Sequence, residues 1–263
     1  MSTTIHSSAV VHPSAELAAD VELGAYAIVE AGASLASGCR IAAHAIIRAH
    51  SVLGENVTVD SFASVGGLPQ DLTFDPTTRS RVRIGAGSVI REGVTLHRST
   101  LPDGETNIGA DCLLMANSHV GHDCDLGDGV ILANNAMLAG HVEVGSGSFL
   151  GGGCGIHQYV SIGELVMVAG NASVTYDVPS FVTVAERSIV TGLNLVGMKR
   201  KLSKAAISDL RTCYKAVYMK TGDPAKLAGD AIATTEEGQC FLDGFKTSRR
   251  GRFSRSRAQE RKA

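Results

Sequence analysis

Four histidines occupy the middle third of this 263-residue chain, at spacings that could bring them together in space. They are His119, His122, His141 and His157. Neutral imidazoles gathered on one surface suit either a general base with supporting hydrogen bonds or a zinc site built on nitrogen ligands. The choice depends on where each ring points, and that is set by the elements that carry the histidines.

An aliphatic residue recurs every six positions through most of the chain. Eleven stand in phase from Ile5 to Val65 and twelve from Ile108 to Val174, with three more between the two runs. Helices repeat their apolar stripe at three and four residues, so this period favours short strands whose side chains alternate inward and outward. A small residue often follows the aliphatic one and predicts a corner. Three such sides close a triangular coil of eighteen residues, and stacked coils form a parallel β solenoid.

The repeat places the histidines on one edge of this prism. Val120, Leu138 and Ile156 are eighteen residues apart, so they should stack on one side and point into the lumen. The histidines beside them then point outward across three successive coils. His97, which follows Leu96, is expected at the corner of the coil below.

Gly140 adds a second chemical group to this edge. It lies eighteen residues after His122, one coil above it, and its missing side chain leaves the backbone N–H uncovered. A proton acceptor beside an oxyanion donor supplies the parts that acyl transfer needs. No Ser or Cys of the cluster sits in a nucleophile-elbow motif, so direct attack by a substrate hydroxyl is the simpler route. Zinc is the alternative, with His119, His122 and His141 as three nitrogen ligands.

Two breaks in the period, and its end, divide the chain. The solenoid is expected over residues 1–191, with loops at 66–83 and 98–107 where the hexads fail, and such excursions often carry function. Helical spacing after Ser203 and the Asp223-Pro224 pair predict a small C-terminal α-helical domain over 192–245 that covers the end of the solenoid. The Arg-rich residues 246–263 are expected to form a flexible, solvated tail.

The composition argues against several classes of protein. A net charge of −2 gives no general attraction to nucleic acid. No apolar stretch is long enough to span a membrane, and the N-terminus lacks the features of a signal peptide, so a cytosolic protein is expected. The six cysteines form no CxxC pair and several fall within the repeat, which favours reduced packing residues.

Several motifs resemble one family of hexapeptide-repeat enzymes. The most specific is His-Val-Gly-His-Asp-Cys at residues 119–124. It resembles the acyl-carrier-protein-dependent UDP-N-acetylglucosamine O-acyltransferases, which catalyse the first step of lipid A biosynthesis, and so do five further motifs: Gln70–Leu72, Val94–Arg98, Ile131–Ala136, Leu138–His141, and Asn194 with Gly197–Arg200. The resemblance covers residues 5–245. It implies a left-handed parallel β-helix, a homotrimer with active sites between neighbouring chains, and no resident cofactor, because the acyl chain arrives as a carrier-protein thioester.

The resemblance also implies roles for individual residues. His122 would be the general base toward the sugar 3-hydroxyl and Gly140 the oxyanion donor, while Asp123 would either orient His122 or be a solvated corner acid. The substrate-binding positions would be Asp71, His97, His119, His141, His157, Gln158, Gly170, Asn194 and Arg200. The cations expected to dock an acidic carrier protein are Lys199, Arg200, Lys201 and Arg211.

Departures from the family pattern keep other interpretations open. Thr73 and Val196 stand where the family often carries Lys and Glu, and residues 185–190 differ from its usual run. The alternatives are a zinc hydro-lyase resembling the β-helical carbonic anhydrases, a coenzyme A acetyltransferase, and a solenoid scaffold without chemistry. Gly170 favours a medium-to-long 3-hydroxyacyl donor, and a 3-amino sugar is an alternative acceptor.

Overall fold

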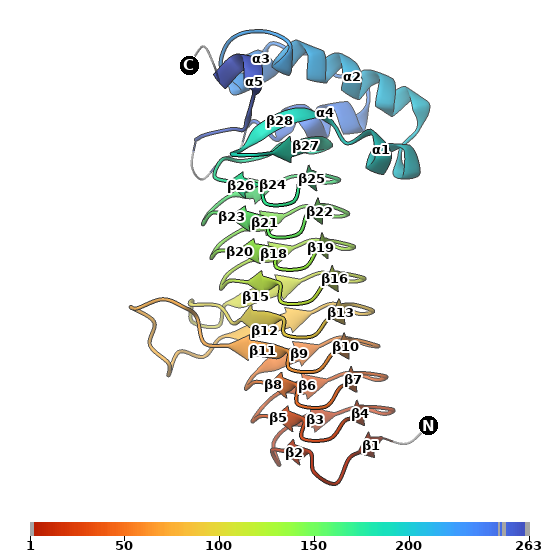
Figure 1. The fold of residues 1–263 in the computed structure, drawn as a ribbon, viewed down its shortest axis with the longest axis vertical. Helices are drawn as coiled ribbons and strands as arrows, with labels where there is room; N and C mark the ends of the chain where they lie inside the picture. Colours follow the sequence, from red (N-terminus) through yellow and green to blue (C-terminus); the bar gives the residue numbers. More distant parts are fainter. Residues whose placement is uncertain (1–2, 247, 249–250, 261–263) are drawn as a thin grey trace.

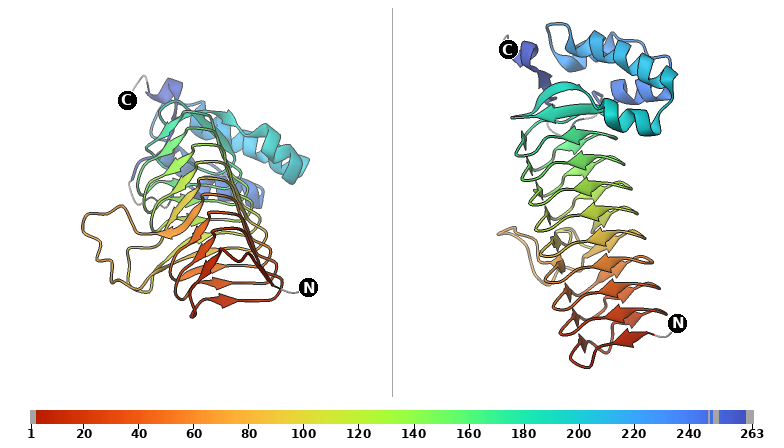
Figure 2. Two further views of the ribbon diagram at one scale, coloured as in Figure 1. Left: turned by 60° about the horizontal axis from the view of Figure 1, so that its bottom comes forward. Right: turned by 45° about the vertical axis from the view of Figure 1, so that its right-hand side comes forward.

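The chain folds into a three-sided prism of stacked coils with a helical cap at its C-terminal end (Figures 1 and 2). The structure is a computed structural model and describes residues 3–246, 248 and 251–260. Each side of the prism is a sheet of short strands, here called faces 1, 2 and 3 in the order in which the chain visits them. The strands pair in parallel, except for the antiparallel pair β27·β28 at the capped end.

The strands of each face follow one another up the prism. Face 1 contains β1 (Thr4–Ile5), β4 (Glu22–Leu23), β7 (Arg40–Ile41), β10 (Thr58–Val59), β13 (Val89–Ile90), β16 (Leu113–Leu114), β19 (Ile131–Leu132), β22 (Phe149–Leu150), β25 (Met167–Val168), β27 (Val182–Ala185), β28 (Ile189–Leu193) and β29 (Arg255–Ser256). Face 2 contains β2 (Val10–Val11), β5 (Ile28–Val29), β8 (Ile46–Ile47), β11 (Ser64–Gly67), β14 (Thr95–His97), β17 (His119–Val120), β20 (Met137–Leu138), β23 (Gly155–Ile156) and β26 (Ser173–Val174). Face 3 contains β3 (Glu16–Leu17), β6 (Ser34–Leu35), β9 (Ser51–Leu53), β12 (Arg81–Ile84), β15 (Glu105–Ile108), β18 (Asp125–Leu126), β21 (Glu143–Val144) and β24 (Ser161–Ile162).

The register predicted from the hexads is confirmed. Val120 pairs with Leu138, and Leu138 with Ile156, in adjacent strands of face 2. All three side chains are buried in the lumen, as are the other in-phase aliphatics from Leu23 onward. The narrow lumen leaves room only for small partners at the corners, and four cysteines fill such positions: Cys39, Cys112, Cys124 and Cys154. All six cysteines are unpaired thiols, as predicted, and burial raises the pKa of Cys124 to about 12.

From residue 19 onward, most corners are short turns whose second residue adopts the left-handed conformation. In the coil that contains His122, for example, Asp123 has a φ of 60°. Two corners on the edge between faces 2 and 3 are replaced by loops, residues 68–80 after β11 and residues 98–104 after β14. The first loop projects far from the prism (Figure 1). Both loops therefore emerge on the edge that carries the histidines.

Five helices follow the solenoid: α1 (Leu195–Lys201), α2 (Lys204–Tyr218), α3 (Pro224–Gly229), α4 (Glu236–Asp243) and α5 (Arg257–Glu260). The two helix starts that the sequence predicts have side-chain N-caps, Ser203 before α2 and Asp223 before α3, where Pro224 takes the first turn. Helix α2 ends at Tyr218, before the Asp223-Pro224 pair that begins α3. No helix among the described residues is long and apolar enough to cross a bilayer.

The prediction of a solvated tail over 246–263 is wrong for residues 251–260. Strand β29 pairs with β28, Phe253 packs on Phe245, and the buried Gln259 amide donates to the carbonyls of Val217 and Lys220. Composition misled here, because a few apolar and amide side chains among the arginines were enough to anchor the segment. Residues 247, 249–250 and 261–263 lie outside the described part of the chain.

Candidate active site

The edge between faces 2 and 3, here called the histidine edge, carries two columns of side chains. The first residues of successive turns are His122, Gly140 and Gln158, and the second residues are Asp123, His141 and Tyr159. The second column is in the left-handed conformation throughout, with φ between 60° and 62°. Stacking turns at the normal strand spacing therefore brings an imidazole, a carboxylate and a second imidazole together.

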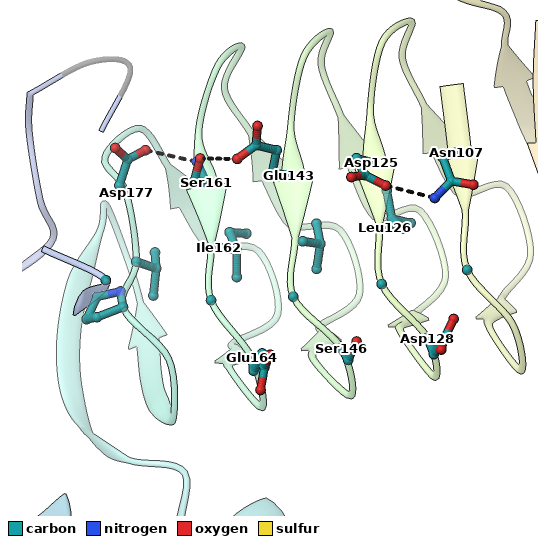
Figure 3. A pocket seen from close by; sticks show the side chains of 18 residues that line it. Asn107, Asp125, Leu126, Asp128, Glu143, Ser146, Ser161, Ile162, Glu164 and Asp177 are labelled. Atoms are coloured by element: carbon teal, nitrogen blue, oxygen red, sulfur yellow. Dashed lines mark hydrogen bonds between the residues drawn. The ribbon is translucent and has the colours of Figure 1, made fainter. Parts of the chain in front are cut away.

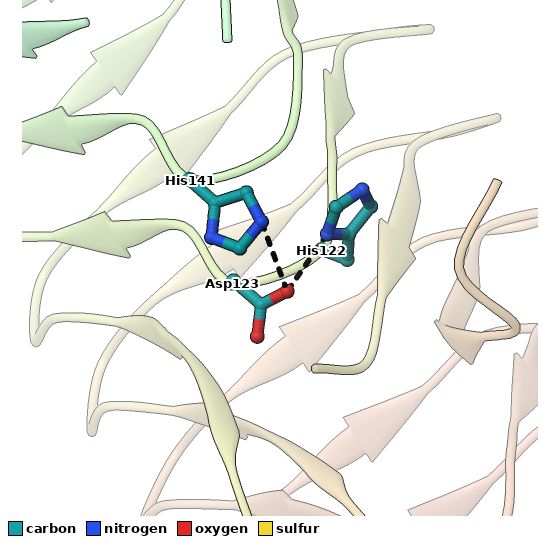
Figure 4. Close-up of side chains that lie close together, drawn as sticks. All are labelled: His122, Asp123 and His141. Carbon is teal, nitrogen blue, oxygen red and sulfur yellow. Dashed lines mark hydrogen bonds and ion pairs between the residues drawn. The ribbon is translucent and has the colours of Figure 1, made fainter. Parts of the chain in front are cut away.

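His122 and Asp123 form a buried hydrogen-bonded pair (Figure 4). Nδ1 of His122 lies 2.7 Å from Oδ2 of Asp123, and the two side chains are only 8% and 7% exposed. An ionised carboxylate can only accept, so Nδ1 carries the hydrogen and Nε2 keeps its lone pair. Nε2 of His122 has no hydrogen-bond partner within the described chain. The ring is thus presented as a proton acceptor, and Asp123 is not a solvated corner acid.

Asp123 is held from several sides. Ser99 donates its hydroxyl to Oδ1, and Thr100 donates its hydroxyl to Oδ2 at 2.6 Å and its N–H to both oxygens at 3.2 Å. Burial alone would raise the pKa of Asp123, but hydrogen bonds from Ser99, Thr100 and His122 together hold it below its ordinary value. The carboxylate therefore remains ionised beside the imidazole.

Gly140 lies directly over the His122 ring. A Cβ built on Gly140 would fall 2.4 Å from Cε1 and 2.6 Å from Nε2 of His122, so no other residue fits. The Gly140 N–H makes no hydrogen bond within the described residues. At equivalent turn positions elsewhere, the N–H of Ala49 donates to the Glu30 carboxylate and that of Ala110 to the Asp128 carboxylate. A turn N–H in this position can therefore bind an anionic oxygen.

Two further imidazoles lie beside the base: His119 in β17 of the same coil and His97 in β14 of the coil below. The His97 and His119 rings meet edge to face at 4.8 Å, and Nδ1 of His119 shares a hydrogen bond of 2.8 Å with the Thr95 hydroxyl. Burial, reinforced by His119 and His122, lowers the pKa of His97 to about 4, so this ring is neutral at pH 7. Nδ1 of His97 is buried without a hydrogen-bond partner in the described chain. It is a free polar atom beside the candidate base.

The first loop brings Asp71 toward the same edge. Asp71 is exposed, and its Oδ1 accepts the N–H and hydroxyl of Thr73, each at 2.8 Å. These two bonds lower the pKa of Asp71, and the charges of His122 and His141 add to the effect. Thr73, a departure from the family pattern, therefore fixes the carboxylate that the sequence assigns to the sugar.

The structure gathers some predicted site residues and separates others. His157 and Gln158 lie exposed on the coil above His141, on the same edge. Gly170 lies at the corner between faces 1 and 2. Asn194 caps α1 and donates to the Leu165 carbonyl at the third corner, and Arg200 is exposed on α1, across the prism from the projecting loop (Figure 1). Gly170, Asn194 and Arg200 are thus remote from His122 within one chain.

Sequence reasoning missed the residues that surround Asp123. Ser99 and Thr100 belong to a loop without periodicity, and the Thr106 hydroxyl, which accepts the Asp123 N–H at 2.8 Å, sits at a lumen position. Tyr159 stacks on His141 with ring centroids 4.4 Å apart. The hexad spacing could have placed Tyr159, since it is eighteen residues after His141, but nothing in the sequence marked Ser99 or Thr100.

One group of side chains among the described residues could surround a metal ion, namely His122, Asp123 and His141, whose ligand atoms lie within 4.8 Å of one another. This is not the predicted set of three histidines, because His119 is turned to Thr95 and His97. Both Asp123 oxygens already accept hydrogen bonds from protein donors, and those bonds account for the arrangement. The carboxylate therefore has little capacity left for a metal ion.

A separate hollow of about 480 Å³ opens on face 3 (Figure 3). Its polar groups bond to one another: Asn107 donates to Asp125, and Ser161 donates its hydroxyl to Glu143 and its N–H to Asp177. It contains no imidazole and is lined mainly by glycine and acidic side chains. The chemistry of this chain is concentrated on the histidine edge instead.

Comparisons with known proteins agree with the geometry. A curated acyl-[acyl-carrier-protein]–UDP-N-acetylglucosamine O-acyltransferase from Anaeromyxobacter sp. (strain Fw109-5) is 48% identical over 219 residues, which cover 81% of this chain and 84% of that protein. The chain belongs to the UDP-N-acetylglucosamine O-acyltransferase family. Family models match in three stretches: a hexapeptide-repeat transferase model at 105–140, a succinyl-transferase hexapeptide repeat at 141–176, and domain 2 of UDP N-acetylglucosamine O-acyltransferase at 177–253.

Solved members of the O-acyltransferase family share the whole architecture. The Campylobacter jejuni UDP-N-acetylglucosamine acyltransferase has a TM-score of 0.91 at 35% identity, covering 97% of this chain and all of that one. The Acinetobacter baumannii protein has a TM-score of 0.90 at 34% identity, covering 95% and 99%. The predicted left-handed parallel β-helix with a small helical domain is confirmed, and this member of the O-acyltransferase family is an acyltransferase.

Proposed function

We propose that this chain transfers a 3-hydroxyacyl group from an acyl-carrier-protein thioester to the 3-hydroxyl of UDP-N-acetylglucosamine, the first step of lipid A synthesis. The observation that carries the mechanism is the free Nε2 of His122 directly below the unpaired N–H of Gly140. The family resemblance supplies the two substrates. Nε2 of His122 and the N–H of Gly140 supply the groups that catalyse the transfer between the two substrates.

The transfer proceeds by general-base catalysis without an acyl-enzyme. The sugar 3-hydroxyl gives its proton to Nε2 of His122 while its oxygen attacks the thioester carbonyl. The Gly140 N–H donates to the oxyanion of the tetrahedral intermediate. Collapse breaks the C–S bond, and the leaving thiolate takes the proton back from His122. Asp123 holds the ring and stabilises the imidazolium throughout, and no metal or organic cofactor is needed.

The remaining site residues divide between the two substrates. Asp71, His97, His119 and His141 surround the base and would hold the sugar. His157 and Gln158 lie on the histidine edge farther toward the helical cap, where a medium-to-long acyl chain would pass, and Gly170, at the corner between faces 1 and 2, would line that path from a neighbouring copy. A 3-amino sugar would fit the same scheme, with the amine as nucleophile.

A homotrimer would complete the site. Asn194 and Arg200 lie across the prism from the histidine edge, so a neighbouring copy must supply them if they bind the nucleotide. A second prism would also exclude water from His122 and form one wall of an acyl groove. The exposed cations of the helical domain, Lys199, Arg200, Lys201 and Arg211, would dock the acidic carrier protein. The cytosolic location stays a prediction.

The test is an acyl-transfer assay with His122→Ala, using 3-hydroxyacyl carrier proteins of several lengths and both acceptor sugars. Loss of the base should lower kcat/KM by roughly 10²–10⁴-fold. His44→Ala is the matched control, because His44 is an exposed histidine on another corner and should leave transfer at the wild-type rate. Unchanged turnover in His122→Ala would contradict the mechanism.

Two further measurements address the alternatives. Tightly held zinc at one ion per chain would favour the hydro-lyase, whereas full transfer activity after chelation would exclude it. A rise in melting temperature with UDP-N-acetylglucosamine is expected, because a ligand that binds the folded state stabilises it. No rise at saturating UDP-sugar would favour a scaffold.

A further inference from the structure

The carboxylate of Asp123 is almost fully occupied before any substrate arrives. Oδ1 accepts from the Ser99 hydroxyl and the Thr100 N–H, and Oδ2 accepts from the Thr100 hydroxyl, the Thr100 N–H and Nδ1 of His122. An ionised carboxylate offers about four lone-pair sites, so this one has little capacity left. Its negative charge is shared among several donors and not given to His122 alone.

The donors come from a loop that is itself fixed. The Ser99 hydroxyl accepts the Leu101 N–H at 3.0 Å and donates its own hydrogen to Asp123. The Ser99 carbonyl accepts the Ser80 hydroxyl at 2.5 Å. Arg98, buried at the start of the loop, donates to the Pro76 and Thr78 carbonyls at 2.9 Å. The second loop thus delivers two hydroxyls in fixed directions and is braced against the first.

The backbone of Asp123 is anchored independently of these hydroxyls. Its backbone N–H donates to the buried Thr106 hydroxyl, and its turn belongs to the regular coil, where His141 N–H donates to the His122 carbonyl at 2.9 Å. The two hydroxyls are therefore not required to hold the backbone of this turn, and they act on the carboxylate itself. What the hydroxyls change is the charge that the carboxylate presents to the imidazole.

We infer that Ser99 and Thr100 are positioning residues for the reaction: by sharing the charge of Asp123, they limit how tightly a proton on His122 is held and so set the pH at which the base becomes available. The inference rests on the proposed function of His122. Full negative charge on Asp123 would keep His122 protonated at higher pH, and a neutral partner would leave it deprotonated but poorly oriented. The loop hydroxyls place the pair between these extremes.

Other charged and titratable groups face the pair and must stay constant in the test. From the neighbouring strands and turns these are His97, His119, His141 and Tyr159, and from the first loop Asp71. Among them, His141 contacts the carboxylate, with its Nε2 3.7 Å from Oδ2 of Asp123. Ser99→Ala and Thr100→Val alter none of these groups.

The experiment measures kcat/KM against pH in the full-length enzyme for Ser99→Ala and Thr100→Val. Each loses one hydroxyl donor, so the acid limb should move to higher pH by about 0.5 unit, which is about a threefold loss of kcat/KM below the midpoint. The high-pH plateau should stay within about twofold. Thr100→Ser keeps a hydroxyl and should restore the wild-type profile, and Asp123→Asn should move the limb the opposite way.

Ser148→Ala is the matched control. Ser148 is a buried serine that bridges turns at another corner, donating to the Gly163 carbonyl and accepting the Val166 N–H, so its loss should not move the profile. An equal fall in kcat/KM at every pH in Ser99→Ala and Thr100→Val would overturn the inference and leave only a structural role. Unshifted profiles would overturn it as well.

A readout without turnover separates this inference from the proposed function. The NMR titration of the His122 imidazole should move upward in Ser99→Ala by the same amount as the kinetic limb. If the wild type transfers no acyl group, the proposed function fails, yet this titration still decides whether the loop hydroxyls control the proton on His122. An unmoved titration in a folded variant would reject the inference on its own.

Discussion

The histidine edge and the edge between faces 3 and 1 have the same turn conformation but carry different side chains. On the latter edge, here called the glycine edge, the left-handed positions hold Asp20, Gly38, Asn56, Gly87, Asp111, Gly129, Gly147 and Leu165. Gly, Asn and Asp enter this conformation at little cost, so all but Leu165 follow the backbone's preference. On the histidine edge the same position holds Gly32, His50, Asp123, His141 and Tyr159, and for the rings among them it costs roughly 1–3 kcal/mol each.

The difference separates what the coil requires from what the chemistry requires. The turn itself asks only for a residue that tolerates positive φ. Imidazole and phenol rings at such positions are disfavoured locally, and they are held by stacking of His141 on Tyr159 and by the contact of His141 with Asp123. Tyr26, His44 and Phe62 adopt the same conformation on the edge between faces 1 and 2 and also stack on one another, so stacking offsets the local cost wherever rings occupy these positions.

The largest predicted effect on kcat/KM comes from adding one methyl group to the histidine edge, and the same addition to the glycine edge is its control. Gly140→Ala puts a Cβ against the His122 ring and should lower kcat/KM by at least roughly 10²-fold, because both the base and the oxyanion donor are displaced. Gly129→Ala on the glycine edge meets no atom within 4 Å and should retain wild-type transfer. Acyl-transfer kinetics on both variants test this. Equal kinetics would mean that Gly140 has only a backbone role.

The second prediction compares two buried aspartates. Asp209 in α2 also accepts hydrogen bonds, from Thr234 N–H and from the N–H and hydroxyl of Thr235, but it has no imidazole beside it. Asp123→Asn should cut kcat/KM by at least roughly 10²-fold, because an amide that donates forces the wrong His122 tautomer. Asp209→Asn should cost about 1–3 kcal/mol of stability and leave kcat/KM unchanged. Urea unfolding and acyl-transfer kinetics, measured on both variants, distinguish the two roles. A large loss of kcat/KM in Asp209→Asn would contradict the distinction.

The third prediction concerns acid stability. The pKa of His97 is about 4 in the folded chain, against an ordinary imidazole value of 6.5, so the unfolded chain binds the extra proton between these values. The stability that His97 contributes is complete above pH 6.5 and is lost as pH falls toward 4, a decrease of about 2–3 kcal/mol.

Urea unfolding between these pH values measures the loss. His97→Gln carries no titrating ring and should flatten the dependence. His44→Gln, which replaces an exposed histidine, should leave it unchanged. A variant lacking His97 that still loses the same stability on acidification would assign the effect to another group.

Much of the fold and part of the site follow from the sequence, for a physical reason. A period of two along each strand and eighteen along each column fixes every regular residue, so Val120, Leu138 and Ile156 located the His122–Gly140 contact in advance. The role of Asp123 could not be assigned from the sequence. Its burial depends on Ser99 and Thr100, which lie in a loop where no period applies.

The capped end was harder to predict than the prism. Asn194 is committed to the Leu165 carbonyl and to capping α1, contacts that join segments unrelated by the repeat. The folded stretch 251–260 depends on single side chains, Phe253 and Gln259, meeting partners far away in the sequence. Long-range contacts of this kind leave no local pattern in the sequence. In the solenoid, by contrast, contacts between neighbouring coils recur at a fixed spacing along the chain and can be predicted from it.

The smallest predicted effect is a change in stability on the glycine edge, where the proposed mechanism places no residue. Gly129 has a φ of 65° and open space around it, so substitutions there meet backbone strain alone. Gly129→Asn should cost no more than about 0.5 kcal/mol of stability, whereas Gly129→Val should cost about 1–2 kcal/mol, because a β-branched residue tolerates positive φ poorly. Both should transfer acyl groups at the wild-type rate. If valine is tolerated as well as asparagine, backbone preference does not set the residues of the glycine edge, and the strain attributed to His141 and Tyr159 loses its basis.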